Sequence, residues 1–538
     1  MLGLAAVALL LRHPHDPAGV TAAVVLSLVA AGSAVVHAKR GRAGSLLGSG
    51  VAARLALLAA AAGIPEPPQG PAWTLTLGTL GLATVLDPLR HLLARREIPV
   101  AAHLARAPRG TSRLPVWLPS TIASVALVAA LVAPALSSRA AAGAALGLAA
   151  LALGATAAGI ASSLGHIRAR RRFHGRLASE LARVAPVFVV HWDAPTGTAF
   201  QLAMWLPHLE ALGRPFVVVL RNPATLAEVA PLTSAPVLVC PAMRQMDGVA
   251  VPSVRVAFYV NSATSNAHLV RFPEITHIQV NHGDSDKLAS TNQAMRMYDH
   301  VFVAGQAAVD RFAARGVAML PGATTIVGRP QVAAITRTAR PVHEVDRPSV
   351  LYAPTWSGFH ADSGYSSLEH GAAIVTALLD RGARVVFRPH PYTGRSKAHA
   401  RASAEIVALL AAHARATGIP HRHDTGTDDI AATFNDVDAL VSDVSSIVTD
   451  FLFSEKPVAI VAVGRPGDDA VAGSLVAQVA YVVRASSGGL DGLDTALEGL
   501  LGDDPLAAPR RAAREHHLGP FPVEGYAGHF REAALRHM

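Results

Sequence analysis

The hydrophobic residues of this chain follow two different patterns, one before and one after about residue 170. Up to residue 165, long runs of Ala, Leu, Val and Gly predict helices long enough to cross a bilayer, which takes roughly 20 apolar residues. From about residue 186, short apolar runs alternate with helical stretches, as in βαβ units around a parallel sheet. We place five candidate spans in the first region, at 18–37, 46–64, 72–89, 116–136 and 140–165.

Basic residues between the apolar runs predict how the first region is oriented. Groups of Lys and Arg follow the first, third and fifth spans, whereas the loops after the second and fourth carry almost none. Because positively charged loops stay in the cytoplasm, the second region is expected on the cytoplasmic side of the cell membrane. No group of charges stands out inside the spans, as a pump would need. We interpret residues 1–168 as a multi-pass anchor of about five helices in membrane lipid; a path for lipid or polymer is the alternative.

The second region predicts two Rossmann-type domains joined by a polar linker at Arg329–Pro348. We assign 185–330 to an N-terminal domain and 345–538 to a C-terminal domain, so the expected fold class is an α-helical membrane region followed by α/β domains. The strands of the first domain are expected at Val187–His191, Phe216–Leu220, Val237–Cys240, Val256–Val260, His277–Val280, Val301–Ala304 and Thr325–Val327. Those of the second are expected at Val350–Ala353, Arg384–Phe387, Ala439–Val441 and Val458–Val461, with helices near 368–381, 398–417 and 445–454.

Composition narrows the class of protein. The net charge of +9 comes largely from arginines beside the apolar segments, which suits contact with anionic lipid. A basic face interleaved with aromatic residues is missing, so nucleic-acid binding is excluded. The single cysteine, Cys240, permits no intrachain disulfide and lies in an apolar run, where a small core residue is expected.

A first polar island, Asn281-His282-Gly283 with Lys287, directly follows a predicted strand. Ligands bind at the carboxyl ends of strands in an open α/β sheet. A histidine placed there can act as a general base on an alcohol, and a lysine can neutralise a phosphate oxygen. The alternative is a structural histidine that caps a turn.

Two further islands follow strands of the second domain. In Arg388-Pro389-His390-Pro391, the prolines fix the backbone, so that Arg388 and His390 can hold a diphosphate; a structural turn is the alternative. In Ser442-Asp443-Val444-Ser445-Ser446, hydroxyls stand at a predicted helix start, where phosphates bind and where simple N-capping is the alternative. Thr355 follows another strand and can donate to a phosphate.

Other chemistries find little support in the sequence. P-loop, G-x-S-x-G, H-E-x-x-H, kinase and G-x-G-x-x-G motifs are missing, which weakens the NTPase, hydrolase, metalloprotease and dehydrogenase hypotheses. Asp443 and Asp450 form no tight carboxylate cluster, and His421-x-His423-Asp424 is more typical of a strand edge than of a zinc site. We therefore expect no metal and no cofactor.

The order of these motifs resembles the CDP-glycerol glycerophosphotransferase family, which includes the teichoic-acid primases and polymerases. The similarity covers roughly residues 255–535. It is carried by His282-Gly283-x-x-x-Lys287, Ala353-Pro354-Thr355-Trp356, Arg388-x-His390-Pro391, Ser442-Asp443-x-Ser445-Ser446 with Asp450 and Lys456-Pro457, and Glu524-Gly525-Tyr526-Ala527.

The resemblance implies a GT-B-like pair of domains and an enzyme that transfers glycerol phosphate, or a related polyol phosphate, from a CDP-linked donor. The acceptor would be a hydroxyl of a lipid-linked or cell-wall glycan, as in teichoic-acid synthesis. By this analogy His282 is the catalytic base and His390 a second catalytic residue. The resemblance makes 185–330 the acceptor-side domain and 345–538 the donor-binding domain. Arg388, His390, Ser445 and Ser446 would hold the donor diphosphate. The other substrate-binding residues would be Asn281, Gly283, Lys287, Thr355, Ser442 and Asp443.

Two alternatives remain at this stage. One is a GT-B glycosyltransferase or epimerase that uses a UDP-sugar. The other is a non-catalytic scaffold for envelope synthesis, which is suggested because Asn281, Val444 and Ser357 replace residues usual in the family.

Overall fold

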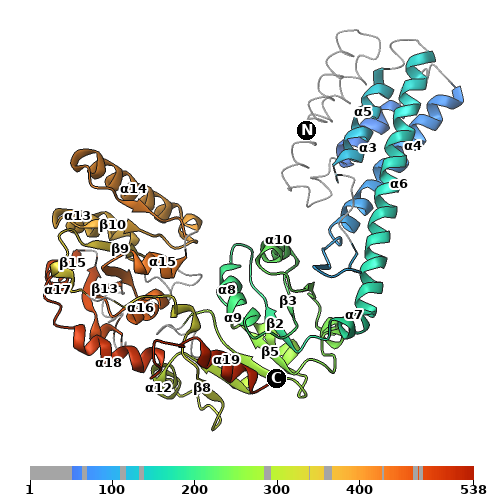
Figure 1. Ribbon diagram of the computed structural model, residues 1–538. Helices are drawn as coiled ribbons and strands as arrows, with labels where there is room; N and C mark the ends of the chain where they lie inside the picture. The colour runs from blue at the N-terminus through green and yellow to red at the C-terminus, as the bar shows by residue number, and fades with distance from the viewer. Residues whose placement is uncertain are drawn as a thin grey trace. The chain divides into compact units, whose positions relative to one another are not determined.

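The chain divides into two compact units, Met1–Glu180 and Leu181–Met538 (Figure 1). The computed structural model describes residues 51–62, 70–108, 115, 117–132, 139–283, 292–337, 340–356, 366–426, 429–463, 471, 476–486 and 488–538.

The first unit is helical where it is described. It contains α3 (Val51–Ala62), α4 (Gly70–Ala94), the two-residue strand β1 (Ala101–Ala102), α5 (Leu118–Val132) and α6 (Arg139–Gly175); α7 (Leu177–Val184) spans the division between the units. Helices α4 and α5 both pack along α6.

The prediction of five membrane spans is not confirmed. Among the described residues, α6 is the one helix long and apolar enough to cross a membrane. Helices α3 and α5 have only 12 and 15 residues, short of the roughly 20 that a bilayer requires. Helix α4 has 25 residues but contains Asp87, Pro88 and Arg90. The predicted span 18–37 lies outside the described residues, so multi-pass membrane localisation is not supported.

The first unit also contains a group of buried charges that the sequence pattern did not reveal. Arg54 Nη2 lies 2.5 Å from Asp87 Oδ2, and Ser120 Oγ donates to the same carboxylate at 2.8 Å. Arg90 donates to the Pro115 carbonyl at 2.8 Å, and Gly159 leaves room for its side chain, since a Cβ there would lie 2.5 Å from Arg90 Nε. The expectation that no charges gather inside the helices is therefore wrong. Helix packing brings together residues that are 25 or more positions apart in sequence.

The second unit begins with a parallel sheet of seven strands in the order β4-β3-β2-β5-β6-β7-β8. Renumbered from its first strand, the order is 3-2-1-4-5-6-7, that of a doubly wound Rossmann sheet. Its strands are β2 (Phe188–Trp192), β3 (Phe216–Leu220), β4 (Val237–Val239), β5 (Val256–Tyr259), β6 (Thr276–Gln279), β7 (His300–Val303) and β8 (Thr324–Ile326). The helices between them are short: α8 (Phe200–Ala203), α9 (Leu206–Glu210), α10 (Leu226–Val229), α11 (Ala267–Val270) and α12 (Gln306–Ala314).

A second sheet repeats the same order, β11-β10-β9-β12-β13-β14-β15, with only its last pair antiparallel. Its strands are β9 (Ser349–Ala353), β10 (Arg384–Phe387), β11 (Arg422–His423), β12 (Ala439–Asp443), β13 (Val458–Val463), β14 (Tyr481–Ser486) and β15 (Gly489–Asp491). The helices in this part of the chain are α13 (Gly371–Asp380), α14 (Lys397–Thr417), α15 (Ile430–Asn435), α16 (Ser446–Phe451), α17 (Leu493–Leu501), α18 (Ala507–Leu518) and α19 (Gly528–Leu535). The predicted pair of Rossmann-type α/β sheets is thus confirmed.

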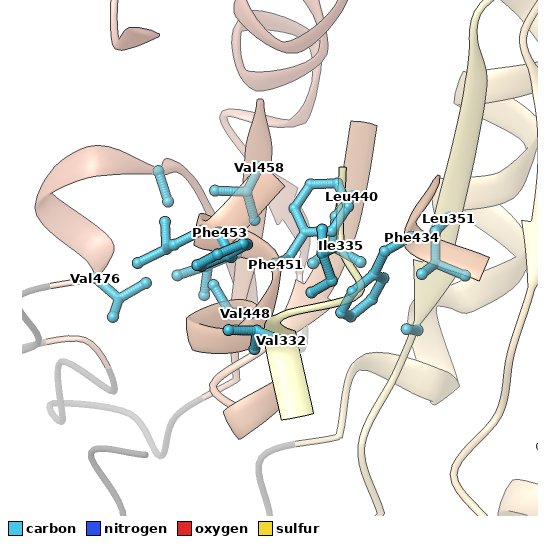
Figure 2. Close-up of a cluster of buried hydrophobic side chains, with 14 of the residues drawn as sticks. Val332, Ile335, Leu351, Phe434, Leu440, Val448, Phe451, Phe453, Val458 and Val476 are labelled. Carbon is cyan, nitrogen blue, oxygen red and sulfur yellow. The ribbon is translucent and has the colours of Figure 1, made fainter. Parts of the chain in front are cut away.

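Apolar side chains cover both faces of the second sheet, as expected for parallel strands flanked by helices. On one face, Leu351 and Leu440 pack with Phe434 of α15 and Phe451 of α16 (Figure 2). On the other, Tyr352 and Val441 pack with side chains of α13, α14 and α17. The strands are therefore held rigidly, which fixes the positions of the polar residues that follow them.

The last helix, α19, returns to the first sheet. Phe530 is buried against Trp205, Phe258 and Phe302, with ring centroids 5.1, 6.3 and 6.3 Å away. The domain boundaries 185–330 and 345–538 remain predictions, but the C-terminal segment contributes to the core of the first sheet. Cys240 is fully buried, as predicted, and burial raises the pKa of its thiol to about 12.

Candidate functional site

The strand order of the second unit marks two places where ligands are expected. In each sheet the direction of winding reverses beside the first strand, between β2 and β5 and between β9 and β12. Loops diverge there at the carboxyl ends of the strands and leave a crevice. His282 follows β6 next to the first reversal, whereas Thr355 and Ser445 follow β9 and β12 at the second.

His282 is held in one tautomer. Its Nδ1 lies 3.1 Å from the carbonyl oxygen of Val260, which can only accept a hydrogen bond, so Nδ1 carries the proton. Nε2 then bears a lone pair, and the amide Nε2 of Gln201 lies 3.4 Å from it. Burial, followed by the positive charge of Arg329, lowers the pKa of His282 to about 4. At neutral pH the ring is therefore an uncharged proton acceptor.

The neighbours of His282 fix its place in the loop. Asn281 adopts a left-handed backbone conformation, with φ of 52°, and its carbonyl accepts a hydrogen bond from the Trp205 indole. Gly283 lies against Ser446 of the second sheet, since a Cβ on Gly283 would lie 3.0 Å from Ser446 Oγ. Gly283 of the first island and Ser446 of the third therefore meet, although more than 150 residues separate them. Lys287 lies outside the described residues.

Arg329 and Asp450 form a buried ion pair beside this contact. Arg329 Nε and Nη2 both face the carboxylate, with 3.0 Å between Nη2 and Oδ2, and the backbone N–H of Arg329 donates to the Tyr526 hydroxyl at 2.9 Å. Asp450 is thus engaged by Arg329 and not placed to bind a metal. Within the described ranges, no three His, Cys, Asp or Glu residues gather closely enough to hold a metal ion.

Three of the predicted binding residues are built into the second sheet. Ser442 Oγ donates to the carbonyl of Ala353 at 2.6 Å, which joins β12 to β9. Asp443 accepts the backbone N–H of Thr355 at 2.6 Å. All three side chains are buried. Their geometry indicates that they set the shape of the strand ends.

His390 is held in the opposite tautomer to His282. The backbone N–H of Tyr392 donates to His390 Nδ1 at 3.1 Å, so in the neutral ring Nε2 carries the proton. The ring stacks on Trp356 at a centroid distance of 5.8 Å and meets the edge of Phe200 at 6.5 Å. Through Nε2, His390 can therefore donate a hydrogen bond, whereas Nε2 of His282 accepts one.

Arg388 has side-chain partners within the protein, whereas the side chains of Ser445 and Ser446 are partly exposed. Arg388 Nη1 forms an ion pair with Asp424 and lies 3.4 Å from Thr433 Oγ1. Ser445 occupies the N-cap of α16, but its side chain makes no capping hydrogen bond. Neither Ser445 nor Ser446 is fully buried, so both remain within reach of a ligand.

Helix α8 connects the two candidate histidines. Its residues Phe200 and Gln201 are adjacent in the chain; the first contacts His390 and the second contacts His282. The turn before α8 also contacts the second sheet's loops, where Arg395 Nη2 donates to the Thr196 carbonyl at 3.3 Å. Sequence reasoning missed Phe200, Gln201 and Tyr392, because none of them belongs to a polar island. The one signal for α8 was the Pro-Thr-Gly turn at 195–197 before it.

The second unit thus pairs two doubly wound α/β sheets, a class of fold that binds ligands at the carboxyl ends of its strands. Residues 254–465 match the family model described as CDP-Glycerol:Poly(glycerophosphate) glycerophosphotransferase. The match supports a CDP-glycerol glycerophosphotransferase-type enzyme with a CDP-glycerol-type donor. It runs from just before β5 to just after β13 and includes every predicted site residue. No curated protein matches the chain in sequence.

Several solved structures are similar to this chain. The wall teichoic acid polymerase TagF, in a variant soaked with CDPG, is 12% identical, with a TM-score of 0.43 over 69% of this chain and 94% of its own. A glycosyltransferase from Rickettsia africae is 11% identical, with a TM-score of 0.41 over 65% and 98%. The UDP complex of S. aureus MnaA is 12% identical, with a TM-score of 0.42 over 65% and 97%.

Proposed function

We propose that this protein transfers glycerol phosphate, or a related polyol phosphate, from a CDP-linked donor to a hydroxyl of a lipid-linked or cell-wall glycan, as in teichoic-acid-like polymer synthesis. The observation that carries the proposal is the state of His282. Its Nδ1 is occupied by a carbonyl and its Nε2 is an uncharged proton acceptor. An uncharged imidazole nitrogen with a free lone pair can accept the proton of an alcohol.

The proposed step needs only groups of this chain and its substrates. The acceptor hydroxyl gives its proton to His282 Nε2, and its oxygen forms a bond to the phosphorus of the donor's glycerol phosphate. The bond between that phosphorus and the bridging oxygen breaks, and CMP leaves with the electron pair. His390, which carries its proton on Nε2, donates to an oxygen of the departing phosphate.

The other predicted residues have different proposed roles. Ser445 and Ser446 donate hydroxyl hydrogen bonds to the donor diphosphate, and Lys287 adds positive charge. Arg388, which is paired with Asp424 at the carboxyl end of β10, adds positive charge near the donor diphosphate. Asn281, Gly283, Thr355, Ser442 and Asp443 shape the loops, as their backbone and strand contacts indicate.

We further propose that the first unit anchors the enzyme in the cell membrane, with the second unit on the cytoplasmic side. Support comes from α6, an apolar helix of 37 residues that ends in a group of arginines. The test is alkaline carbonate extraction of membranes that contain the full chain. Retention in the pellet is expected, and release into the supernatant would contradict the anchor.

The function is tested by CMP release from CDP-glycerol and from CDP-ribitol, with the detergent-purified full chain and a lipid-linked acceptor mixture. His282→Ala and His390→Ala should each lower turnover by about 10²- to 10⁴-fold, the usual contribution of a general acid or base. His343→Ala is the matched control, since His343 is partly exposed and lies beside Gly502 and Asp503 in the second domain. It should keep wild-type turnover.

Three results would contradict the proposal. Near-wild-type turnover in both His282→Ala and His390→Ala would show that neither histidine takes part in the reaction. Turnover of UDP-sugars without turnover of CDP-linked donors would favour the UDP-sugar enzyme. If the protein is folded but turns over no nucleotide-linked donor, the hypothesis of a non-catalytic scaffold for envelope synthesis would be favoured.

A further inference from the structure

Gln201 of α8 holds its side-chain amide in one orientation. The Trp192 indole, which can only donate, gives its N–H to Gln201 Oε1 at 3.2 Å. Asn261 Nδ2, which also donates to the Asp193 carbonyl at 2.9 Å, lies 3.5 Å from the same oxygen. Since two donors face Oε1, the amide nitrogen Nε2 is directed away from them and lies 3.4 Å from Nε2 of His282.

The residues that orient this amide belong to the rigid part of the first sheet. Trp192 is the last residue of β2 and is fully buried, and Asn261 follows β5 and is 8% exposed. If the amide turned over, the indole N–H of Trp192 would face a second donor and lose its acceptor, which is costly for a buried group. Gln201 therefore presents N–H groups, and no acceptor, to His282.

The contact between Gln201 and His282 is long for a direct hydrogen bond. The two nitrogens are 3.4 Å apart, whereas N–H donors in proteins usually lie about 2.9–3.0 Å from their acceptors. The imidazole is kept in place by the bond of its Nδ1 to the Val260 carbonyl at 3.1 Å. An oxygen atom about 2.9 Å from both nitrogens would complete a triangle with the observed separation. That oxygen would accept from Gln201 and donate to His282, which a hydroxyl does with its one hydrogen and two lone pairs.

A hydroxyl can reach this pair of side chains. Gln201 and His282 are both partly exposed. A pocket adjoins the loop of His282, because its lining includes Asn281 and Gly283, which flank His282 in the chain, and Trp205, which follows α8. The space beside the proposed base is therefore open to a substrate.

We propose that Gln201 positions the acceptor: its amide N–H binds the oxygen of the reacting hydroxyl and so directs the O–H bond at His282 Nε2. With one lone pair bound to Gln201, the oxygen keeps its second lone pair for the donor phosphorus. This arrangement favours attack, because the orientation of the reacting group is fixed before the reaction. Gln201 precedes the segment 254–465 that matches the family model, so its role is not part of that match. The inference rests on the proposed function and adds a residue to the acceptor's site.

The first test removes the amide and measures turnover. In Gln201→Met, which keeps the length of the side chain, kcat/KM for the lipid-linked acceptor at saturating CDP-glycerol should fall about 10- to 100-fold, the effect of losing a bond that orients a substrate. The KM for CDP-glycerol should stay unchanged. Gln331→Met is the matched control, because Gln331 is also partly exposed and its amide donates to the Met204 carbonyl at 3.3 Å. It should keep both wild-type constants.

The second test needs no turnover and probes the contact itself. Diethyl pyrocarbonate modifies an imidazole only at an unprotonated nitrogen, and mass spectrometry of the peptide that contains His282 reports on that residue alone. In the wild type the modification rate should change little between about pH 5 and about pH 8, since burial and the charge of Arg329 lower the pKa of His282 to about 4.

The same measurement is then made on Gln201→Glu. Its carboxylate would face Nε2 of His282 and raise the pKa of that imidazole by about 1–3, so the modification rate should fall at the acid end of the range. Gln331→Glu is the control and should behave like the wild type. If Gln201→Met does not fold, Gln201→Glu replaces it in the first test, at a pH where His282 is unprotonated, because a glutamate can keep the Trp192 bond but lacks the N–H.

The outcomes distinguish a wrong inference from a wrong function. If the wild type turns over CDP-glycerol and Gln201→Met keeps the wild-type kcat/KM for the acceptor, Gln201 is a structural residue and the inference is wrong. If the wild type turns over no donor, the proposed function fails, and the modification rates alone decide whether Gln201 faces an accessible base. An unmodified His282 in the wild type, or equal pH dependence in the wild type and Gln201→Glu, would overturn the inference.

Discussion

At the scale of single residues, the two candidate histidines are distinguished by one hydrogen bond each. A carbonyl binds Nδ1 of His282 and makes Nε2 an acceptor, whereas a backbone N–H binds Nδ1 of His390 and makes Nε2 a donor. These complementary tautomers suit a reaction that removes a proton from one oxygen and stabilises another. Arg329 adds to the asymmetry, because its charge lowers the pKa of His282.

The effect of Arg329 on the pKa of His282 predicts how the reaction rate depends on pH. The acid limb of kcat/KM for the wild type should lie near pH 4, because His282 loses its function as a base only when it is protonated. In the double variant Arg329→Gln with Asp450→Asn, the positive charge is gone and no unpaired carboxylate is left behind. The limb should then move to higher pH. A pH–rate profile in both proteins checks this, and an unshifted limb would show that Arg329 does not act on the base.

At the scale of elements, the C-terminal helix α19 completes a domain far from it in sequence. Phe530 is buried between the indole of Trp205 and the rings of Phe258 and Phe302, on α8–α9 and on strands β5 and β7. Trp205 also donates to the Asn281 carbonyl in the loop of His282. Helix α19 therefore supports the loop that holds the proposed base.

Removal of the Phe530 ring should destabilise the second unit. Phe530→Ala is expected to lower the free energy of unfolding by about 3–5 kcal/mol, the usual range for a buried phenylalanine. Leu232→Ala, at a residue 38% exposed, should cost much less. Denaturant unfolding followed by tryptophan fluorescence compares them. Equal stability of the two variants would mean that α19 is not part of the first sheet's core.

At the scale of the whole molecule, the second unit repeats one topology twice and brings the two reversal points together. Gly283 of one sheet lies against Ser446 of the other, and the Arg329–Asp450 pair fastens the same junction. The junction is assembled from residues on both sides of the linker.

The first sheet also contains buried histidines, and His191 on β2 is fully buried. Burial, and then the positive charge of Arg221, lowers the pKa of His191 to about 3.

Buried neutral histidines predict loss of stability in acid. The unfolded chain binds a proton on each histidine near pH 6.5, whereas native His191 does so only near pH 3 and His282 near pH 4. Between these values the unfolded state holds more protons, so stability falls as the pH falls from about 6.5. The thermal midpoint should drop between pH 7 and pH 4.5, and less so in His191→Leu than in His343→Leu. Equal drops in both variants would contradict the role of His191.

Much of the architecture could be predicted because it depends on local patterns. Phe216–Leu220 and Arg384–Phe387 were predicted with the bounds that the structure shows, and the other predicted strands differ by one or two residues at an end. Buried parallel strands are short apolar runs that end at polar residues, so each run marks its own limits. Strands β14 and β15 were not predicted, because they are only half-buried and β15 has three residues.

The sequence by itself determined the two Rossmann-type sheets and the identity of the polar islands that follow their strands, since hydrophobic periodicity and turn residues are local properties. Only the tertiary structure decided which of those residues face one another. It assigned Ser442, Asp443 and Asp450 to strand and ion-pair contacts and joined His282 to Gln201. These facts depend on which side chains meet across sheets, and a hydrogen bond between residues 80 or more positions apart leaves no periodic trace in the chain.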